Sequence, residues 1–152
     1  MSTSYSFRAK ARWTSQRRGI AEGESPAPSI DFDAPPEFQG EAGFWTPEHF
    51  LLAAVSACFI TTFRAIAELS KFSAEALDVQ TEGTIEKAES GLQFTRIILR
   101  PTLTVSAGSD RDRAVRLLEK AERSCIISRS LRAEVRMEPN VYTSEAAQVH
   151  AA

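Results

Sequence analysis

The chain has 152 residues, 43% of them hydrophobic and 25% charged, which is the composition of one ordinary globular domain. Its formal net charge of -2 argues against nucleic acid as a principal partner, because nucleic-acid-binding domains usually carry a basic surplus. Two cysteines are too few for a disulfide-rich secreted scaffold. The start of the chain lacks the apolar run of a secretory signal, and the uncharged run at residues 50–63 is shorter than the roughly 18 residues of a spanning helix. We therefore expect a cytoplasmic protein.

The first fifty residues predict short strands joined by turns. "SYSFRAKARW" alternates apolar and polar residues with the period of a half-buried strand. The turn "TSQRRG" leads into a second strand near residues 19–22, and alternation at Ile30 and Phe32 indicates a third.

A long helix is predicted from Pro47 to about Ser70. Thr46 is its candidate N-cap, and Pro47 and Glu48 occupy first-turn positions where proline and acids are favoured. The first two-thirds are apolar all round, so the helix should be buried on nearly every side. One layer of strands covers only one side of a helix, and a second copy of the chain is the simplest cover for the other. We therefore expect a homodimer.

The second half predicts a hairpin, two helices and a final strand. The hairpin strands fall at residues 77–87 and 92–106, with Pro101 marking an edge or a bulge. An amphipathic helix follows, a short helix begins near Cys125, and the last strand alternates around Val135. Residues 144–152 read as a mobile tail. The order indicates an α+β fold in a single domain, residues 1–143. The helix residues expected to point inward are Ala114, Val115, Leu117, Leu118 and Ala121.

The two cysteines are the candidates for chemistry. Cys58 lies in mid-helix, where apolar surroundings keep a thiol protonated, so it needs a nearby cation such as arginine to become a nucleophile. Cys125 lies at a helix start, where unpaired N–H groups favour a thiolate. In the plainer alternative both cysteines are packing residues. The only histidines are His49 and His150, and no Cys-x-x-Cys pair exists, so we expect no metal and no cofactor.

Three segments resemble the OsmC/Ohr family. "TPEHFLLAAVSACF" is similar to the family's helix motif, in which an Asn/Thr-Pro-Glu start precedes an alanine-rich helix that bears the reactive cysteine. "AERSCIISRSL" resembles the second cysteine motif, and "TSQRRGIAEGE" resembles the turn that holds the family's arginine. The resemblance extends over residues 5–142. Two differences stand out: the family's Cys-Pro-Val-Ser is Cys-Ile-Ile-Ser at residues 125–128, and its Gly-Gly before the arginine is Ser-Gln at residues 15–16.

The resemblance implies an OsmC-like fold, with a long buried central helix wrapped by antiparallel strands in an intertwined homodimer. It implies a thiol peroxidase that reduces organic hydroperoxides and is recycled by an external dithiol, commonly a lipoyl group. By matching position, Cys58 is the peroxidatic cysteine and Cys125 the resolving one. Glu48 matches the family's glutamate, and Arg17 its arginine, with Arg18 as the alternative.

Helix geometry adds an expectation about the dimer. Glu48 and Cys58 are separated by ~15 Å along one helix and roughly 80° around it, so Glu48 should meet Cys58 of the partner. Each active site would then combine residues of both chains. We expect an apolar pocket lined by Phe50, Phe59 and Phe63, although such aromatics are more often core residues.

Two other functions stay open at this point. A hot-dog-like acyl-CoA thioesterase would use Glu48 as its base and leave both cysteines as packing residues. A non-enzymatic OsmC-like dimer would bind an apolar ligand at its interface without turnover.

Overall fold

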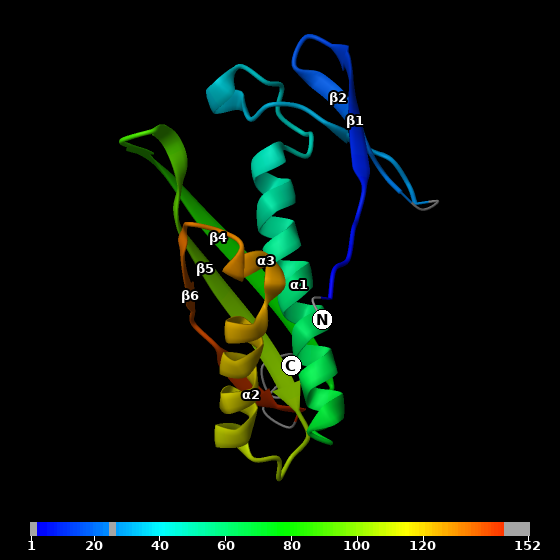
Figure 1. Cartoon of the computed structure of the whole chain (residues 1–152). Helices are drawn as coiled ribbons and strands as arrows, with labels where there is room; N and C mark the ends of the chain where they lie inside the picture. The colour runs from blue at the N-terminus through cyan, green and yellow to red at the C-terminus, as the bar shows by residue number, and fades with distance from the viewer. Residues whose placement is uncertain (1–2, 25–26, 145–152) are drawn as a thin grey trace, which may run out of the picture. The chain divides into compact units, whose positions relative to one another are not determined.

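The computed structural model describes residues 3–24 and 27–144, and it divides into two compact units, Met1–Leu51 and Leu52–Ala152 (Figure 1). Residues 145–152, which include His150 and nearly all of the predicted tail, lie outside the described residues.

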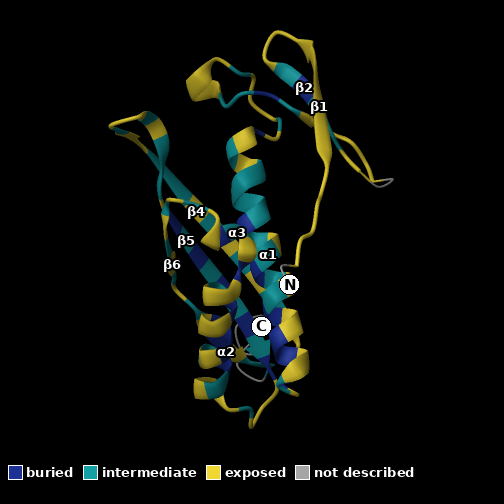
Figure 2. Cartoon of the chain, in the orientation of Figure 1, coloured by how far each residue is buried: buried dark blue, intermediate teal, exposed yellow. Residues whose placement is uncertain are grey.

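The first unit contains a three-stranded antiparallel sheet. Its strands are β1 (Ala9–Ser15), β2 (Arg18–Gly23) and β3 (Ile30–Phe32), in the order β1-β2-β3, and a 3-10 turn η1 (Pro36–Phe38) follows. The three predicted strands are confirmed. The half-buried character predicted for the first is wrong, because β1 is exposed along its whole length (Figure 2). None of the described residues of its own unit buries either face of β1, so the alternation does not reflect burial within that unit.

The helix α1 (Pro47–Leu69) begins where the sequence predicts. The Thr46 hydroxyl accepts a hydrogen bond from the His49 backbone N–H at 3.1 Å, which confirms the N-cap. Within the single chain only one stripe of α1 is buried, and Ala57 and Thr61 are exposed, so burial of the other faces stays a prediction that depends on a second copy. The stripe consists of Val55, Phe59, Phe63, Ile66 and Ala67.

By length and composition alone, α1 could cross a membrane, contrary to the expectation based on the shorter uncharged run. The core helix of a folded domain meets the same criterion. Here Phe59 and Phe63 pack into the core of the second unit, as they would in such a helix.

The second unit is built on a mixed sheet. β4 (Ala76–Ala88) and β5 (Gly91–Val105) form the predicted antiparallel hairpin. On the other side of β5, β6 (Glu134–Met137) and β7 (Asn140–Thr143) both pair parallel to it. The sheet therefore has parallel pairs in addition to the expected antiparallel ones, because the chain returns to β5 through helices, and such crossovers bring strands back in parallel. The single final strand predicted for "RAEVRMEPNVY" is divided into the two short strands β6 and β7.

The sequence predicted that Pro101 marks an edge or a bulge, and this prediction is wrong. Pro101 lies inside the central strand β5, in regular register with Val79 of β4. The bulge of the hairpin does fall in β5, but at Thr95, which is left without a β4 partner between the pairs Thr84–Arg96 and Ile85–Phe94. The Leu99 carbonyl accepts from Glu138, so odd-numbered residues of β5 turn their backbone groups toward β6 and β7. Along β5, pairing with β6 ends at Leu99 and pairing with β7 starts at Thr102. Pro101, which has no backbone N–H to donate, therefore lies in the gap between the two partner strands.

Two helices complete the second unit. α2 (Arg111–Ser124) is capped by the Asp110 side chain, and Cys125 alone separates it from α3 (Ile126–Arg129). From Ile97 to Val105, the odd-numbered residues of β5 form one buried face, against which α1 and α2 pack in a single core (Figure 1). The inward positions predicted for α2 are confirmed: four are buried, and Val115 packs at the edge of the core.

Candidate functional site

Cys58 and Cys125, far apart in the sequence, meet in the second unit. Cys58 is half-buried on α1, and Cys125 is fully buried at the junction of α2 and α3. Both are free thiols, and the neighbouring Cys125 thiol is one of the groups that lower the pKa of Cys58. Core packing of α1 and α2 on the same sheet face produces this meeting, which no local sequence pattern could specify.

The surroundings of Cys58 favour its thiolate. Burial raises the pKa of Cys58, but hydrogen bonds from the Ile127 N–H, the Cys125 thiol, the Thr62 hydroxyl and the Ile126 N–H outweigh it, so the pKa is lowered. Thr62 Oγ1 lies 3.8 Å from the sulfur. These donors are all neutral, so part of the stabilisation that the sequence assigned to a cation comes from the second unit itself.

The pKa of Cys125 is raised, in the opposite direction to that of Cys58. Burial raises the pKa of Cys125 first, and the neighbouring Cys58 raises it further, while the hydroxyl and backbone N–H of Ser128 act in opposition. The Ser128 side chain is buried, and its Oγ has no hydrogen-bond partner of normal geometry among the described residues. The pair therefore divides into a thiol that ionises readily and one that keeps its proton.

The candidate arginines lie in the first unit and differ in their partners. Arg17 is exposed and donates to Gln39 Oε1 at 2.8 Å. Arg18 is committed to the buried Asp33, at 3.3 Å, and to Glu41. Its guanidinium also stacks over Phe44, 4.4 Å from the ring centroid. Arg18 thus stabilises its own unit, and Arg17 is the arginine whose charge is not matched by a carboxylate within the described residues.

Glu48 also belongs to the first unit, in the first turn of α1. One of its carboxylate oxygens, Oε2, is buried and has no hydrogen-bond partner in residues 3–24 and 27–144. A buried carboxylate oxygen without a donor is costly. Oε2 of Glu48 can therefore accept a hydrogen bond from a donor outside the described residues of this chain.

The three aromatic residues predicted to line a pocket belong to different units. Phe59 and Phe63 are fully buried in the core of the second unit, as aromatic core residues are, and their role in an apolar pocket at a dimer interface stays a prediction. Phe63 also borders a cavity that neither cysteine lines. Phe50 lies in the first unit, stacked on Trp45 with ring centroids 5.6 Å apart.

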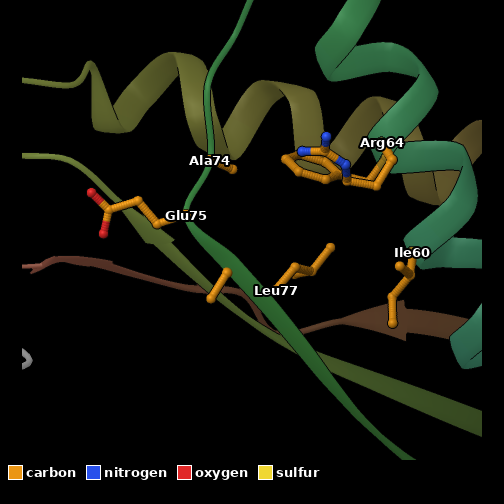
Figure 3. A pocket seen from close by; sticks show the side chains of 7 residues that line it. Ile60, Arg64, Ala74, Glu75 and Leu77 are labelled. Atoms are coloured by element: carbon orange, nitrogen blue, oxygen red, sulfur yellow. The ribbon is translucent and has the colours of Figure 1, made fainter.

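A cavity of about 300 Å³ lies between α1 and the start of β4. Figure 3 shows Ile60 and Arg64 entering it from α1, with Glu75 and Leu77 on the strand side. Neither cysteine lines it, so it is separate from the thiol pair. Its lining combines apolar side chains, such as Ile60 and Leu77, with the charged side chains of Arg64 and Glu75.

No group of three or more potential metal ligands occurs among the residues that the structure describes. His49 Nδ1 lies 2.8 Å from Thr46 Oγ1, so this histidine takes part in capping α1.

Comparison with known proteins identifies the family. The model of the family described as "OsmC-like protein" matches residues 40–140, which include both cysteines. The chain belongs to the OsmC-like family.

Relatives within this family carry different descriptions. The chain is 30% identical over 135 residues to the uncharacterized protein YmaD of Bacillus subtilis, covering 87% of this chain and 90% of YmaD. It is 28% identical over 101 residues to the peroxiredoxin OsmC of Escherichia coli, covering 66% of this chain and 69% of that protein. A crystal structure of an organic hydroperoxide resistance protein OsmC from Legionella pneumophila aligns with a TM-score of 0.74 at 27% identity, covering 93% and 99% of the two chains.

Sequence reasoning found the two cysteines of this OsmC-like chain but missed their partners. Ile126 and Ile127 act through backbone N–H groups, which side-chain patterns do not reveal. Thr62 is four residues after Cys58 and so one turn along the same helix face, a spacing that could have identified it.

Proposed function

We propose that this OsmC-like protein is a cysteine-based peroxidase that reduces organic hydroperoxides to alcohols. The observation that carries the proposal is the contact between two free thiols whose pKa values are shifted apart, Cys58 downward and Cys125 upward. The relatives described as peroxiredoxin OsmC and organic hydroperoxide resistance protein support the same chemistry.

In the first step the Cys58 thiolate attacks the distal oxygen of the peroxide. An S–O bond forms, the O–O bond breaks, and the alkoxide leaves as an alcohol after taking a proton. Cys58 becomes a sulfenic acid, oxidised by two electrons, and the peroxide is reduced by two. Because the surroundings of Cys58 are largely apolar, an alkyl hydroperoxide suits them better than hydrogen peroxide.

In the second step Cys125 attacks the sulfenic sulfur. A Cys58–Cys125 disulfide forms and the sulfenic oxygen leaves as water, which protects Cys58 from further oxidation. An external dithiol, of the lipoyl type, then reduces the disulfide and becomes a disulfide itself. A reducing compartment such as the cytoplasm suits this cycle.

The proposed site is completed by a second copy of the chain. In this homodimer Arg17 orients the peroxide beside Cys58, and Glu48 holds the guanidinium by a bidentate ion pair. The unpaired buried oxygen of Glu48 and the carboxylate-free surroundings of Arg17 support this arrangement. Phe50 is the proposed aromatic contact for the substrate.

The direct test is to titrate the reduced protein with cumene or tert-butyl hydroperoxide and follow free thiols by mass. Both thiols of each chain should disappear together, with an intramolecular Cys58–Cys125 disulfide as the product. Cys58→Ser should abolish the reaction, and Cys125→Ser should leave a sulfenic acid on Cys58 that dimedone traps.

Thiols that persist under excess peroxide would contradict the proposal. Hydrolysis of acyl-CoA with loss on Glu48→Gln would then indicate a thioesterase. Binding of an apolar ligand without turnover would indicate a binding protein, for which the cavity beside Phe63 is available.

A further inference from the structure

Two adjacent threonine hydroxyls of α1 contact Cys58, one helical turn before them. Thr61 and Thr62 follow Cys58 by three and four residues, the spacings that bring side chains together on a helix face. Thr61 Oγ1 donates to the Cys58 carbonyl oxygen at 3.1 Å, whereas Thr62 Oγ1 lies 3.8 Å from Cys58 Sγ and hydrogen-bonds to the sulfur itself. The two neighbours therefore serve different atoms of the same cysteine.

The Thr62 hydroxyl is committed to the sulfur. A threonine inside a helix commonly donates to a backbone carbonyl one turn earlier, as Thr61 does here. Among the residues that the structure describes, the Thr62 hydroxyl makes no hydrogen bond besides the one with Cys58 Sγ. Cys58 and Thr62 are both half-buried, so water can replace this donor only in part.

The direction of this hydrogen bond depends on the charge of the sulfur. With a neutral thiol, either the hydroxyl or the thiol can donate. A thiolate has no proton, so only the Thr62 hydroxyl can donate to it, and a hydrogen bond to an ionised acceptor is stronger than a neutral one. The contact therefore favours the ionised form of Cys58, in agreement with the lowered pKa of this thiol.

We propose that Thr62 is a further catalytic residue, whose hydroxyl donates a hydrogen bond to the Cys58 thiolate and so holds the nucleophile in its reactive form. Donor and sulfur lie one turn apart on the same helix, so the contact depends neither on the first unit nor on a second chain. This inference rests on the proposed function for its purpose, since it adds a residue to the same nucleophilic site. The groups that shift the pKa of Cys58 come from α1 and from the α2–α3 junction, and of these only the Cys125 thiol titrates.

The test is Thr62→Val, which removes the hydroxyl and nearly keeps the shape of the side chain. Thr62→Ser is the conservative variant, because it keeps a hydroxyl at the same position. Thr61→Val is the matched control, because it removes the neighbouring hydroxyl, whose acceptor is a backbone carbonyl and not the sulfur. Thr62→Ala covers the case in which Thr62→Val does not fold, since alanine is the best helix former.

The measurement is the pH dependence of Cys58 alkylation by iodoacetamide, with the modified peptide identified by mass and the fold checked by circular dichroism. Thr62→Val and Thr62→Ala should move the midpoint to higher pH, by up to about one unit. Below both midpoints the rate should then fall by about threefold, because a roughly tenfold loss of thiolate is partly offset by the greater nucleophilicity of a more basic sulfur. The plateau at high pH should not fall, and Thr62→Ser and Thr61→Val should match the parent chain.

Coincident midpoints in the parent chain and the two variants that lack the Thr62 hydroxyl would overturn the proposal. So would an equal shift in Thr61→Val, because the effect would then belong to the helix and not to the hydrogen bond with the sulfur. A lower plateau with an unchanged midpoint would show a structural role only and would also overturn it. Alkylation needs no peroxide, so failure of the peroxidase proposal leaves this result readable. A working peroxidase with an unchanged midpoint would reject the role of Thr62 alone.

Discussion

The Ser128 hydroxyl is buried three residues after Cys125, with no hydrogen-bond partner of normal geometry among the described residues. It opposes the effect of burial on the pKa of Cys125. Ser128→Ala should therefore raise the pKa of Cys125 further and slow the step in which this sulfur leaves the disulfide. The measurement is ultraviolet absorbance of the Cys125 thiolate against pH in a Cys58→Ser background.

Ser130→Ala is the control for this prediction, because it removes an exposed hydroxyl that donates to the Ile126 carbonyl at 2.8 Å. It should leave the Cys125 titration close to that of the parent. Identical titrations of Ser128→Ala and the parent would show that the hydroxyl does not act on the sulfur.

The pKa of Cys58 governs how peroxide consumption should depend on pH. The reacting form is the thiolate and its pKa is lowered, so the rate should be retained above the Cys58 pKa and lost as the pH falls through it. Initial rates of Cys58 oxidation by cumene hydroperoxide would be compared with those of a free cysteine derivative. The protein should lose its rate at a lower pH than the free thiol, and an equal or higher midpoint would refute the assignment of the nucleophile.

At the scale of elements, the hairpin and α1 are held together by a close approach at Gly83. A Cβ there would lie 2.6 Å from Phe94 Cε1 and 2.8 Å from Leu52 Cδ2, which is too near for an ordinary contact. Gly83→Ala should therefore lower the free energy of unfolding by about 1–3 kcal/mol, measured in urea. Gly23→Ala is the control, since a Cβ at Gly23 meets nothing within 4 Å. Equal losses in the two variants would contradict the close-approach argument.

At the scale of the whole molecule, one chain leaves large apolar side chains uncovered. Phe7 is 90% exposed, Trp13 75% and Leu69 86%, more than solubility favours. We predict that sedimentation will give twice the chain mass of 16.7 kDa. A species of single-chain mass with full peroxidase activity would contradict the dimer and its shared sites.

Shared sites make a sharper prediction for mixed chains. If each site combines Cys58 of one chain with Glu48 of the other, Cys58→Ser and Glu48→Gln chains should each be impaired alone. Dissociated and reassociated together, they should regain activity, because one site of each mixed dimer then keeps both groups. Mixtures that stay as inactive as the separate variants would place both groups of a site on one chain.

The sequence by itself determined the order of elements, because each depends on local signals. The Thr46 cap, the alternation of the hairpin strands and the amphipathic pattern of α2 are all readable within a few turns of chain. The two cysteine motifs also sufficed to indicate the OsmC-like family, which the match over residues 40–140 confirms.

Only the tertiary structure decided how distant residues combine. The parallel pairing of β6 and β7 and the place of Pro101 depend on a crossover that local alternation does not encode. Apart from Thr62, the groups that lower the pKa of Cys58 belong to a turn far along the chain, and packing on the shared face of β5 brings that turn near the sulfur. Local patterns reflect which face of an element is apolar, whereas the partner of that face is selected by the free energy of burying it.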